Sequence, residues 1–240
     1  MLKKVIFLLV LSLIIFTGCK KSVLLEYKPS EEEIKYKFIM ESKTTAEGDT
    51  LNEATSILNR SITMDVNISQ KILATTEKDL LSNDITIEEG EIKDSAEERI
   101  FQDKGKKINI KMKRNGEVLK ISDESFESTP QTVLPDKPVS PGDKWSSKVK
   151  YLNKMFEASY ILEKFEKING KDCAVINLDM PEKTFEVDTR ITKITMKGNI
   201  YFDYNKGQLV SSHIEKNISI ETINTNDKLK INQIIEIKTR

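Results

Sequence analysis

The chain has 240 residues, of which 38 are Lys or Arg and 38 are Asp or Glu, so its formal net charge is zero at pH 7. A protein that binds nucleic acid needs a basic surface that displaces counterions from phosphates. The balanced and dispersed charges of this chain supply no such surface, so nucleic acid is excluded as a partner. The length allows one large domain or two halves of about 100 residues.

Residues 1–19 have the pattern of a bacterial secretory signal. Lys3 and Lys4 precede an apolar run from Val5 to Phe16, which is shorter than a membrane span. The next residues, Thr17-Gly18-Cys19, resemble a lipobox, with Phe16 where that motif usually has Leu. The resemblance implies that residues 1–18 are removed and that the Cys19 sulfur carries diacylglycerol. We therefore expect an extracytoplasmic protein that is lipid-anchored to a bacterial membrane, at the cell surface or on the periplasmic face.

The anchor has consequences for the residues that follow it. Residues 19–30 are predicted to be the acylated Cys and a polar tether, which reaches at most about 40 Å when fully extended. Acylation of Cys19 leaves Cys173 without a partner for a disulfide within the chain. Because Ala174, Val175 and Ile176 follow Cys173, we expect a buried structural thiol rather than a reactive one.

Most of the chain alternates apolar and polar residues, as strands with one buried face do. Asn115-Gly116 predicts a two-residue type I′ turn that places Ile110 opposite Ile121 and Met112 opposite Leu119. Asn169-Gly170 lies between two further alternating segments. A three-residue loop there would set Leu162 against Leu178, with Gly170 or Lys171 at positive φ, whereas a two-residue loop would set Leu162 against Asn177.

Residues 128–144 contain four of the six prolines, Pro130, Pro135, Pro138 and Pro141. Proline cannot donate to a strand ladder, so we expect a crossing between an N-terminal β-rich half, residues 31–127, and a C-terminal β-rich half, residues 145–240. Pro141-Gly142 fits the centre of a type II turn. The predicted fold is mainly β. Long curved antiparallel strands form a half-open barrel or a sandwich from two β-rich halves, with at most one or two short helices, and Ser95 to Phe101 is the candidate for one.

Several turn and packing signals carry a resemblance. Pro138-Val139, Gly142-Asp143 and Trp145, with the later segments Gly198 to Asp203 and Gly207 to Leu209, resemble a family of uncharacterised secreted bacterial lipoproteins with a central Pro-Val-x-x-Gly-Asp-x-Trp segment. The likeness spans residues 31–240 and implies an architecture without an activity. A looser likeness is to periplasmic lipoprotein carriers and their lipidated receptors, whose half-open barrels hold acyl chains.

Signatures of an enzyme are missing from the sequence, which has no nucleophile elbow, phosphate loop or dinucleotide fingerprint. The single histidine, His213, follows Ser211 and Ser212, but catalytic partners are recognised by geometry rather than adjacency, so we interpret it as structural. Glu88 to Glu91 is interpreted as a solvated acidic turn, with Ca²⁺ binding as the alternative. We therefore predict no catalytic residue, no metal and no cofactor.

These observations favour a non-enzymatic binding module whose concave sheet takes an apolar or amphipathic ligand, or a partner protein of the cell envelope. The candidate ligand contacts are the aromatic residues Trp145, Phe156, Tyr160 and Phe202. One alternative is a structural surface lipoprotein with a filled core, in which Trp145 is part of the packing. A second is a hydrolase of cell-envelope material that uses a carboxylate pair such as Glu186 with Asp188.

Overall fold

The computed structural model describes residues 21–48, 58–96, 99–123, 132–151, 154–223, 225 and 227–240. The predicted signal and Cys19 lie outside these residues. Eleven strands account for most of them: β1 (Ile34–Glu47), β2 (Arg60–Ala74), β3 (Leu80–Asp94), β4 (Lys107–Lys113), β5 (Val118–Ile121), β6 (Lys144–Tyr151), β7 (Lys154–Ile168), β8 (Lys171–Val187), β9 (Arg190–Asp203), β10 (Gln208–Thr222) and β11 (Lys228–Thr239). The described residues include no helix long and apolar enough to cross a bilayer. The helix expected near Ser95 falls partly on residues 97–98, outside the described part.

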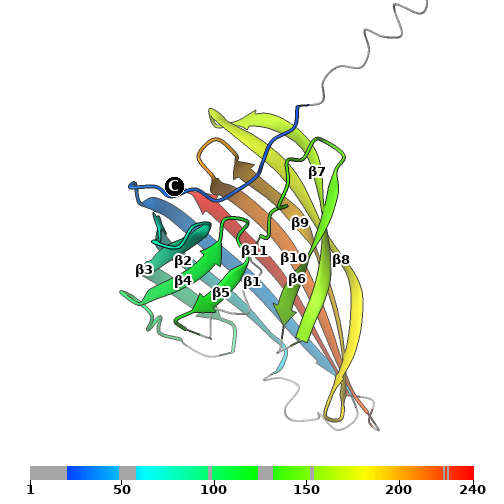
Figure 1. Cartoon of the computed structure of the whole chain (residues 1–240). Helices are drawn as coiled ribbons and strands as arrows, with labels where there is room; N and C mark the ends of the chain where they lie inside the picture. Colours follow the sequence, from blue (N-terminus) through cyan, green and yellow to red (C-terminus); the bar gives the residue numbers. More distant parts are fainter. Residues whose placement is uncertain are drawn as a thin grey trace, which may run out of the picture.

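The strands form one antiparallel sheet in the order β5-β4-β3-β2-β1-β11-β10-β9-β8-β7-β6. Neighbours in this order are also neighbours in sequence, except that β1 pairs with β11 along most of its length. The two predicted halves are therefore continuous parts of one curved sheet (Figure 1), which confirms the mainly β fold and selects the half-open barrel over the sandwich. Among the described strands, β5 and β6 are the two ends of the order, although they follow one another in the chain.

Alternation of side chains gives the sheet an apolar inner face. On three central strands, Phe38 of β1 lies opposite Ile237 of β11, and Met40 lies opposite Ile235, which lies opposite Ile214 of β10. Cross-strand partners point to the same side of a sheet. Every second residue of each strand therefore contributes to one continuous apolar surface. The buried side chains form two clusters, one mainly from β7 to β10 and one from β2 to β4.

Residues 21–30 are part of this fold and do not form the predicted tether. Val23 and Val139 exchange two backbone hydrogen bonds of 2.9 Å, and the Tyr27 amide donates to the Arg114 carbonyl at 2.7 Å. Leu25 is fully buried in the larger core cluster, and the Tyr27 ring packs edge-on against Phe202. Figure 1 shows the segment crossing one end of the sheet. The prediction missed this because polar residues flank its short apolar stretch and because it contains Pro29.

The described part of the Pro-rich crossing, residues 132–143, has the predicted turn. Gly142 has a φ of 95°, and the Asp143 amide donates to the Ser140 carbonyl at 3.0 Å, as a type II turn over Pro141-Gly142 requires. Leu134 and Val139 of this crossing are buried in the same cluster as Leu25. The crossing and the N-terminal segment thus fill one end of the half-open barrel together.

The two asparagine–glycine hairpins both differ from the predicted loop length. The loop at Asn115-Gly116 is longer than predicted, and the loop at Asn169-Gly170 is shorter. At Asn115-Gly116 the loop has three residues, with Gly116 at a φ of 89° and the Lys113 amide bonded to the Glu117 carbonyl. Ile110 faces Ile121 as predicted, but Met112 faces Val118 rather than Leu119. The three-residue loop displaces the pairing by one residue next to the turn, and a bulge at Leu119 restores the predicted register further along the hairpin.

At Asn169-Gly170 the loop has two residues, since Asn169 and Gly170 have φ values of 49° and 78° and Ile168 pairs with Lys171. The predicted positive φ of Gly170 is confirmed and the three-residue loop is wrong. A bulge between Leu162 and Lys164 then shifts the register, so Leu162 faces Ile176 rather than Leu178. A bulge inside the strand, rather than a longer loop, keeps the apolar side chains of the two strands on the same face.

The acidic segment Glu88 to Glu91 lies inside β3, so it is not a turn. The register between β2 and β3 shifts next to Glu88, which has no opposite residue of its own. Gly90 faces Val66 across the ladder, and a Cβ at Gly90 would lie 2.7 Å from the ring of Phe101. Glycine is therefore used here to admit the Phe101 ring to the smaller core cluster.

Candidate functional site

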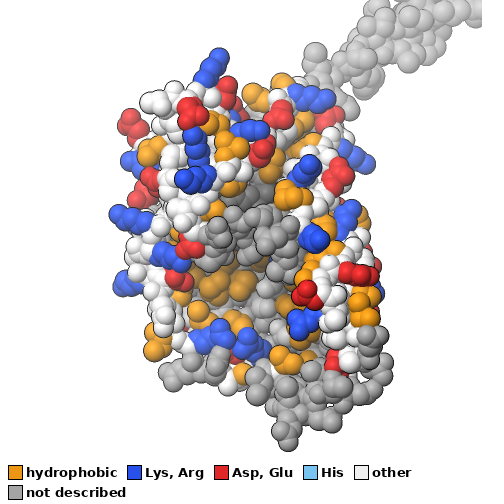
Figure 2. Space-filling model, turned by 60° about the horizontal axis from the view of Figure 1, so that its bottom comes forward, with side chains coloured by type: hydrophobic (Ala, Val, Ile, Leu, Met, Phe, Trp, Pro, Cys, Tyr) orange, Lys and Arg blue, Asp and Glu red, His pale blue; other side chains and the backbone are white. Residues whose placement is uncertain are grey.

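The molecule is hollowed where its sheet is open. Figure 2, which turns the lower end of the sheet toward the viewer, shows hydrophobic side chains on the floor of a hollow between two flanks. Lysine, arginine and acidic side chains lie along those flanks. An apolar floor with charged rims is the usual surface of a site for an apolar or amphipathic ligand.

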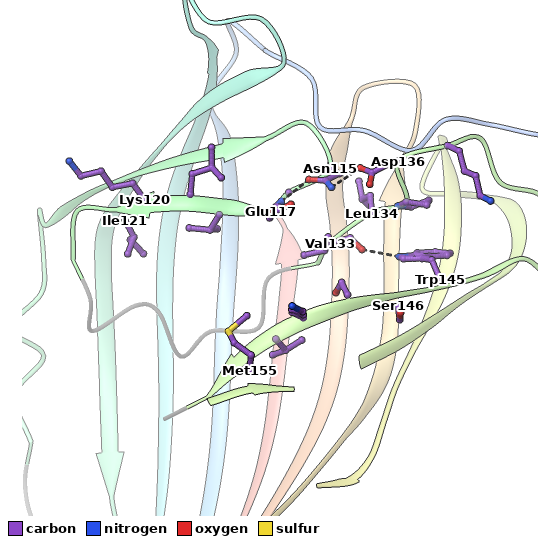
Figure 3. Close-up of a pocket in the computed structure, with 18 residues that line it drawn as sticks. Asn115, Glu117, Lys120, Ile121, Val133, Leu134, Asp136, Trp145, Ser146 and Met155 are labelled. Atoms are coloured by element: carbon purple, nitrogen blue, oxygen red, sulfur yellow. Dashed lines mark hydrogen bonds between the residues drawn. The ribbon is translucent and has the colours of Figure 1, made fainter. Parts of the chain in front are cut away.

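A cavity of about 890 Å³ occupies the open side of the sheet. Its walls come from residues 115–121 of the β4–β5 hairpin, residues 133–137 of the crossing, residues 145–149 of β6, and Met155 of β7. Figure 3 shows Ile121 on one side and Ser146 and Met155 on the other. The volume lies within the range of about 300–1,000 Å³ that small-molecule sites have.

The apolar part of the wall is assembled from all of these segments. It comprises Val118, Ile121, Val133, Leu134, Val149 and Met155. Leu134 is 2% exposed and anchors the crossing in the core, whereas Met155 is 56% exposed and stands at the mouth. The two edge strands do not pair with each other in the described part of the chain, so the cavity lies where the sheet is unclosed.

Trp145 has a fixed position in the wall. Its indole Nε1–H donates to the Val133 carbonyl at 2.9 Å, which ties β6 to the crossing (Figure 3). Its ring stacks on Tyr160 with a centroid distance of 5.6 Å and an interplanar angle of 8°. Tyr160 is buried, and that burial raises the pKa of its phenol. The polar edge of the indole is thus satisfied within the protein.

A hydrogen bond closes one end of the cavity. The Asn115 side-chain amide donates to Asp136 Oδ1 at 2.8 Å, joining the β4–β5 turn to the crossing (Figure 3). A smaller cavity of about 300 Å³ lies on the other side and shares Asn115, Pro135 and Asp136 with the larger one. Leu24 and Leu25 of the N-terminal segment also line it. The two cavities therefore adjoin at Asn115, Pro135 and Asp136.

The four aromatic residues predicted as ligand contacts have different surroundings. Trp145 lines the cavity and Tyr160 stacks against it. Phe156 of β7 is half-buried, with its ring 5.1 Å from that of Phe185. Phe202 is fully buried under Tyr27. Of these residues, the structure places Trp145 in the cavity wall.

Sequence reasoning missed the contribution of the crossing and of the β4–β5 hairpin to the wall. Val133 and Leu134 lie between prolines, where alternation gives no signal, and Val118 and Ile121 read as ordinary strand residues. The apolar pair Val133-Leu134 within a polar, proline-rich stretch was the available clue. Leu134 packs in the core and Val133 lines the cavity, so the pair marks the point where the crossing meets both.

A lysine lies among apolar side chains on the inner face of the central strands. Lys216 of β10 is 5% exposed and shares its face with the buried residues Ile214 and Ile218. It lies opposite Gln233 of β11 and Met196 of β9. Burial disfavours the charged form and lowers the pKa of this amine to about 8.

We predict that Lys216 makes stability depend on pH in the alkaline range. Between pH 8 and 10.5 the amine is neutral in the folded chain and protonated in the unfolded chain, so the unfolded state binds more protons and the free energy of unfolding rises with pH. Urea denaturation of the wild type and of Lys216→Met over this range would measure it. The free energy of unfolding of the wild type should increase relative to that of Lys216→Met as pH rises. A difference that stays constant with pH would contradict the assignment.

The residues weighed for chemistry have structural surroundings. His213 is on the outer face, where its Nδ1 lies 3.1 Å from Glu236 Oε1, while the neighbouring Ser212 is buried on the opposite face. Cys173 is buried, as predicted, and burial raises the pKa of its thiol. Asp188 lies in the exposed turn between β8 and β9. Within the described ranges, no group of three or more His, Cys, Asp or Glu side chains could hold a metal ion.

Comparison with known proteins gives no family. No family model matches the chain, and no curated protein matches it. Among solved structures, one described as "Lipid-protein interactions in lipovitellin" is similar to 90% of this chain, with a TM-score of 0.49 and 8% sequence identity. The chain covers 25% of the length of that protein. A likeness of this size does not establish a shared fold.

Proposed function

We propose that the protein is a membrane-anchored extracytoplasmic lipoprotein that binds an apolar or amphipathic ligand without catalysing a reaction. The observation that carries the proposal is the cavity of about 890 Å³ between the two edges of the sheet. The proposal places the ligand's apolar part against Val118, Val133 and Val149, with the Trp145 ring as a flat contact surface.

The composition of the cavity suits an amphipathic ligand. Each methylene that leaves water for an apolar wall contributes about 0.8 kcal/mol. Lys120, Lys137 and Lys148 also line the cavity, together with Glu117 and Asp136. A ligand whose hydrocarbon lies between the strands can therefore place a polar or anionic head at this charged rim, where both partners stay hydrated.

The membrane anchor is the second part of the proposal, and it rests on the lipobox-like Thr17-Gly18-Cys19. Two or three acyl chains on Cys19, each methylene contributing about 0.8 kcal/mol, hold a protein on a bilayer in an effectively permanent way. If Cys19→Ala left the protein in the membrane fraction in the same amount as the wild type, the anchor would be wrong.

The single tryptophan gives a direct test of ligand binding. Trp145 is the one Trp in the chain and lines the cavity, so its fluorescence reports on the site. We expect saturable quenching when a chain that begins at Lys20 is titrated with dibromostearate, because bromine quenches indole at contact distance. Stearate is the matched control and should compete without quenching. Absence of saturable quenching, or quenching that stearate does not reverse, would refute the proposed site.

A structural surface lipoprotein with a filled core is the second candidate, and the packed end of the barrel favours it. Leu25, Leu134 and Val139 fill that end to near-complete burial. On this alternative the cavity takes no ligand, and protein purified from its own membrane would yield no bound lipid or other small molecule by mass spectrometry. A partner protein remains a further candidate, since β5 and β6 are the described edges of the sheet.

A further inference from the structure

We infer that the anchored protein has a defined orientation, in which one end of the sheet faces the phospholipid bilayer. This anchor end consists of residues 21–28 and the turns at residues 75–79, 114–116, 169–170 and 204–207. The inference rests on the proposed lipid anchor and adds to it an orientation and a source of ligand. Figure 1 shows the N-terminal segment crossing this end, while the β8–β9 turn lies at the opposite end.

The N-terminal segment is bound to the anchor end along its whole described length. Its amides at Val23, Tyr27, Lys28 and Ser30 donate to backbone carbonyls of Val139, Arg114, Gly207 and Ile72, respectively, at 2.7–3.3 Å. The four acceptors belong to the crossing, the β4–β5 turn, the β9–β10 turn and β2. A segment held by so many separate elements keeps one position on the sheet.

Lys21, the first described residue, is itself fixed at this end. Its ammonium group lies 4.5 Å from the ring centroid of Tyr204 and 5.1 Å from that of Phe165, and it donates to the Tyr204 hydroxyl. Cys19 precedes Lys21 by two residues, and two backbone steps of 3.8 Å reach at most about 8 Å. An acylated Cys19 therefore brings the bilayer surface next to Tyr204 and not to a distant part of the sheet.

The surface of the anchor end agrees with contact to lipid headgroups. Leu24 is 41% exposed beside the fully buried Leu25, and Lys21 and Lys206 are exposed there as well. A lysine near an anionic membrane surface contributes about 1 kcal/mol. Leu24 lines the smaller cavity with Lys113 and Arg114, as well as with Glu26, Asp79 and Asp136. An exposed leucine beside basic side chains can enter the headgroup region while those side chains stay at the phosphates.

The cavities relate this orientation to the proposed ligand. The smaller cavity, lined by Leu24 and Glu26, lies at the anchor end, and it shares Asn115 and Asp136 with the larger one. A lipid taken from the supporting bilayer would thus meet the smaller cavity first and the larger cavity beyond the Asn115–Asp136 bond. The bilayer in which the protein is anchored becomes the source of its ligand.

The test compares labels at the two ends of the complete, acylated protein. Lys206→Cys and Lys167→Cys place an exposed thiol at or near the anchor end, while Thr189→Cys and Glu186→Cys place one at the opposite end. The two ends are well separated, because the 17 residues of β8 extend about 55 Å at 3.3 Å per residue. The wild type controls for labelling of Cys173, which is buried.

A bimane label at each position is measured on vesicles of phosphatidylcholine and phosphatidylglycerol that contain a headgroup nitroxide lipid. Quenching several-fold stronger at positions 206 and 167 than at 189 and 186 is expected. Equal quenching at the two ends, stronger quenching at 189 and 186, or no quenching in protein that floats with the vesicles would each overturn the orientation. Protein that does not float would overturn the anchor as well. Ligand binding is measured separately through Trp145, so failure of the orientation is distinguished from failure of the proposed ligand site.

Discussion

Replacing Leu25 with alanine is expected to lower the free energy of unfolding by about 2–5 kcal/mol, the cost of removing a buried leucine side chain and leaving a cavity. Leu25 is fully buried in the main cluster with Val139 and Phe202, so the neighbouring strands cannot collapse around the missing atoms without losing contacts of their own. Urea denaturation of a chain that begins at Lys20, followed by circular dichroism, would measure the change.

The adjacent residue supplies the matched control for this prediction. Leu24 is 41% exposed, so Leu24→Ala should change the free energy of unfolding by no more than about 0.5 kcal/mol. If Leu25→Ala were equally mild, residues 21–30 would be the loose tether predicted from the sequence, and the defined orientation on the membrane would lose its basis.

Replacing Ser147 with phenylalanine is expected to weaken ligand binding by at least about tenfold, or about 1.4 kcal/mol. Ser147 lies in β6 between Trp145 and Val149, and residues two apart in a strand share a face. All three line the cavity, so the added ring would occupy volume that the ligand uses. Titration with dibromostearate, with Trp145 fluorescence as the signal, would measure the dissociation constant.

Ser159→Phe is the matched control for Ser147→Phe. Ser159 is exposed on the neighbouring strand β7, opposite Ser146, and is not part of the cavity wall. The same change of side chain there should leave the dissociation constant unaltered, and both variants should keep the circular dichroism of the wild type. Unchanged binding by a folded Ser147→Phe variant would place the ligand elsewhere.

The fold was predictable where alternation is strong. The even-numbered apolar residues of β1 and β2, such as Phe38 and Val66, do form one wall, because a buried face selects a single parity. The same signal was present in Val23, Leu25 and Tyr27, which alternate in a segment otherwise read as a tether. Three residues are too short a pattern to outweigh polar neighbours and a proline, although they are enough to bind a segment to a sheet.

Register was less predictable than strand identity. A longer loop or a bulge could each keep the apolar side chains around Asn169-Gly170 on one face. The sequence has the same apolar pattern in either case, so it does not distinguish them. Local turn chemistry decided the outcome: Asn169 and Gly170 both accept positive φ, so the two-residue turn forms and the extra residue is accommodated at Glu163. In predicting the length of a hairpin loop, the conformational preferences of the turn residues should therefore be given more weight than the matching of apolar residues across the two strands.

The cavity could not be read from the sequence because segments far apart in the chain build it. Val118, Val133 and Val149 come together because β5 and β6, consecutive in sequence, stand at opposite ends of the strand order and face each other across the open side. That arrangement depends on β1 pairing with β11. No local sequence pattern predicts that the first strand pairs with the last.

The pairing of β1 with β11 also governs when the sheet can form. Most of the chain separates β1 from β11, so one edge of β1 stays open until residues 228–239 are available to pair with it. A chain interrupted before Lys228 would leave both β1 and β10 with free edges, which invite pairing with other chains. The presence of β11 is thus a requirement for the complete sheet, and products truncated before it should be recognisable to chaperones and proteases by their unpaired strands.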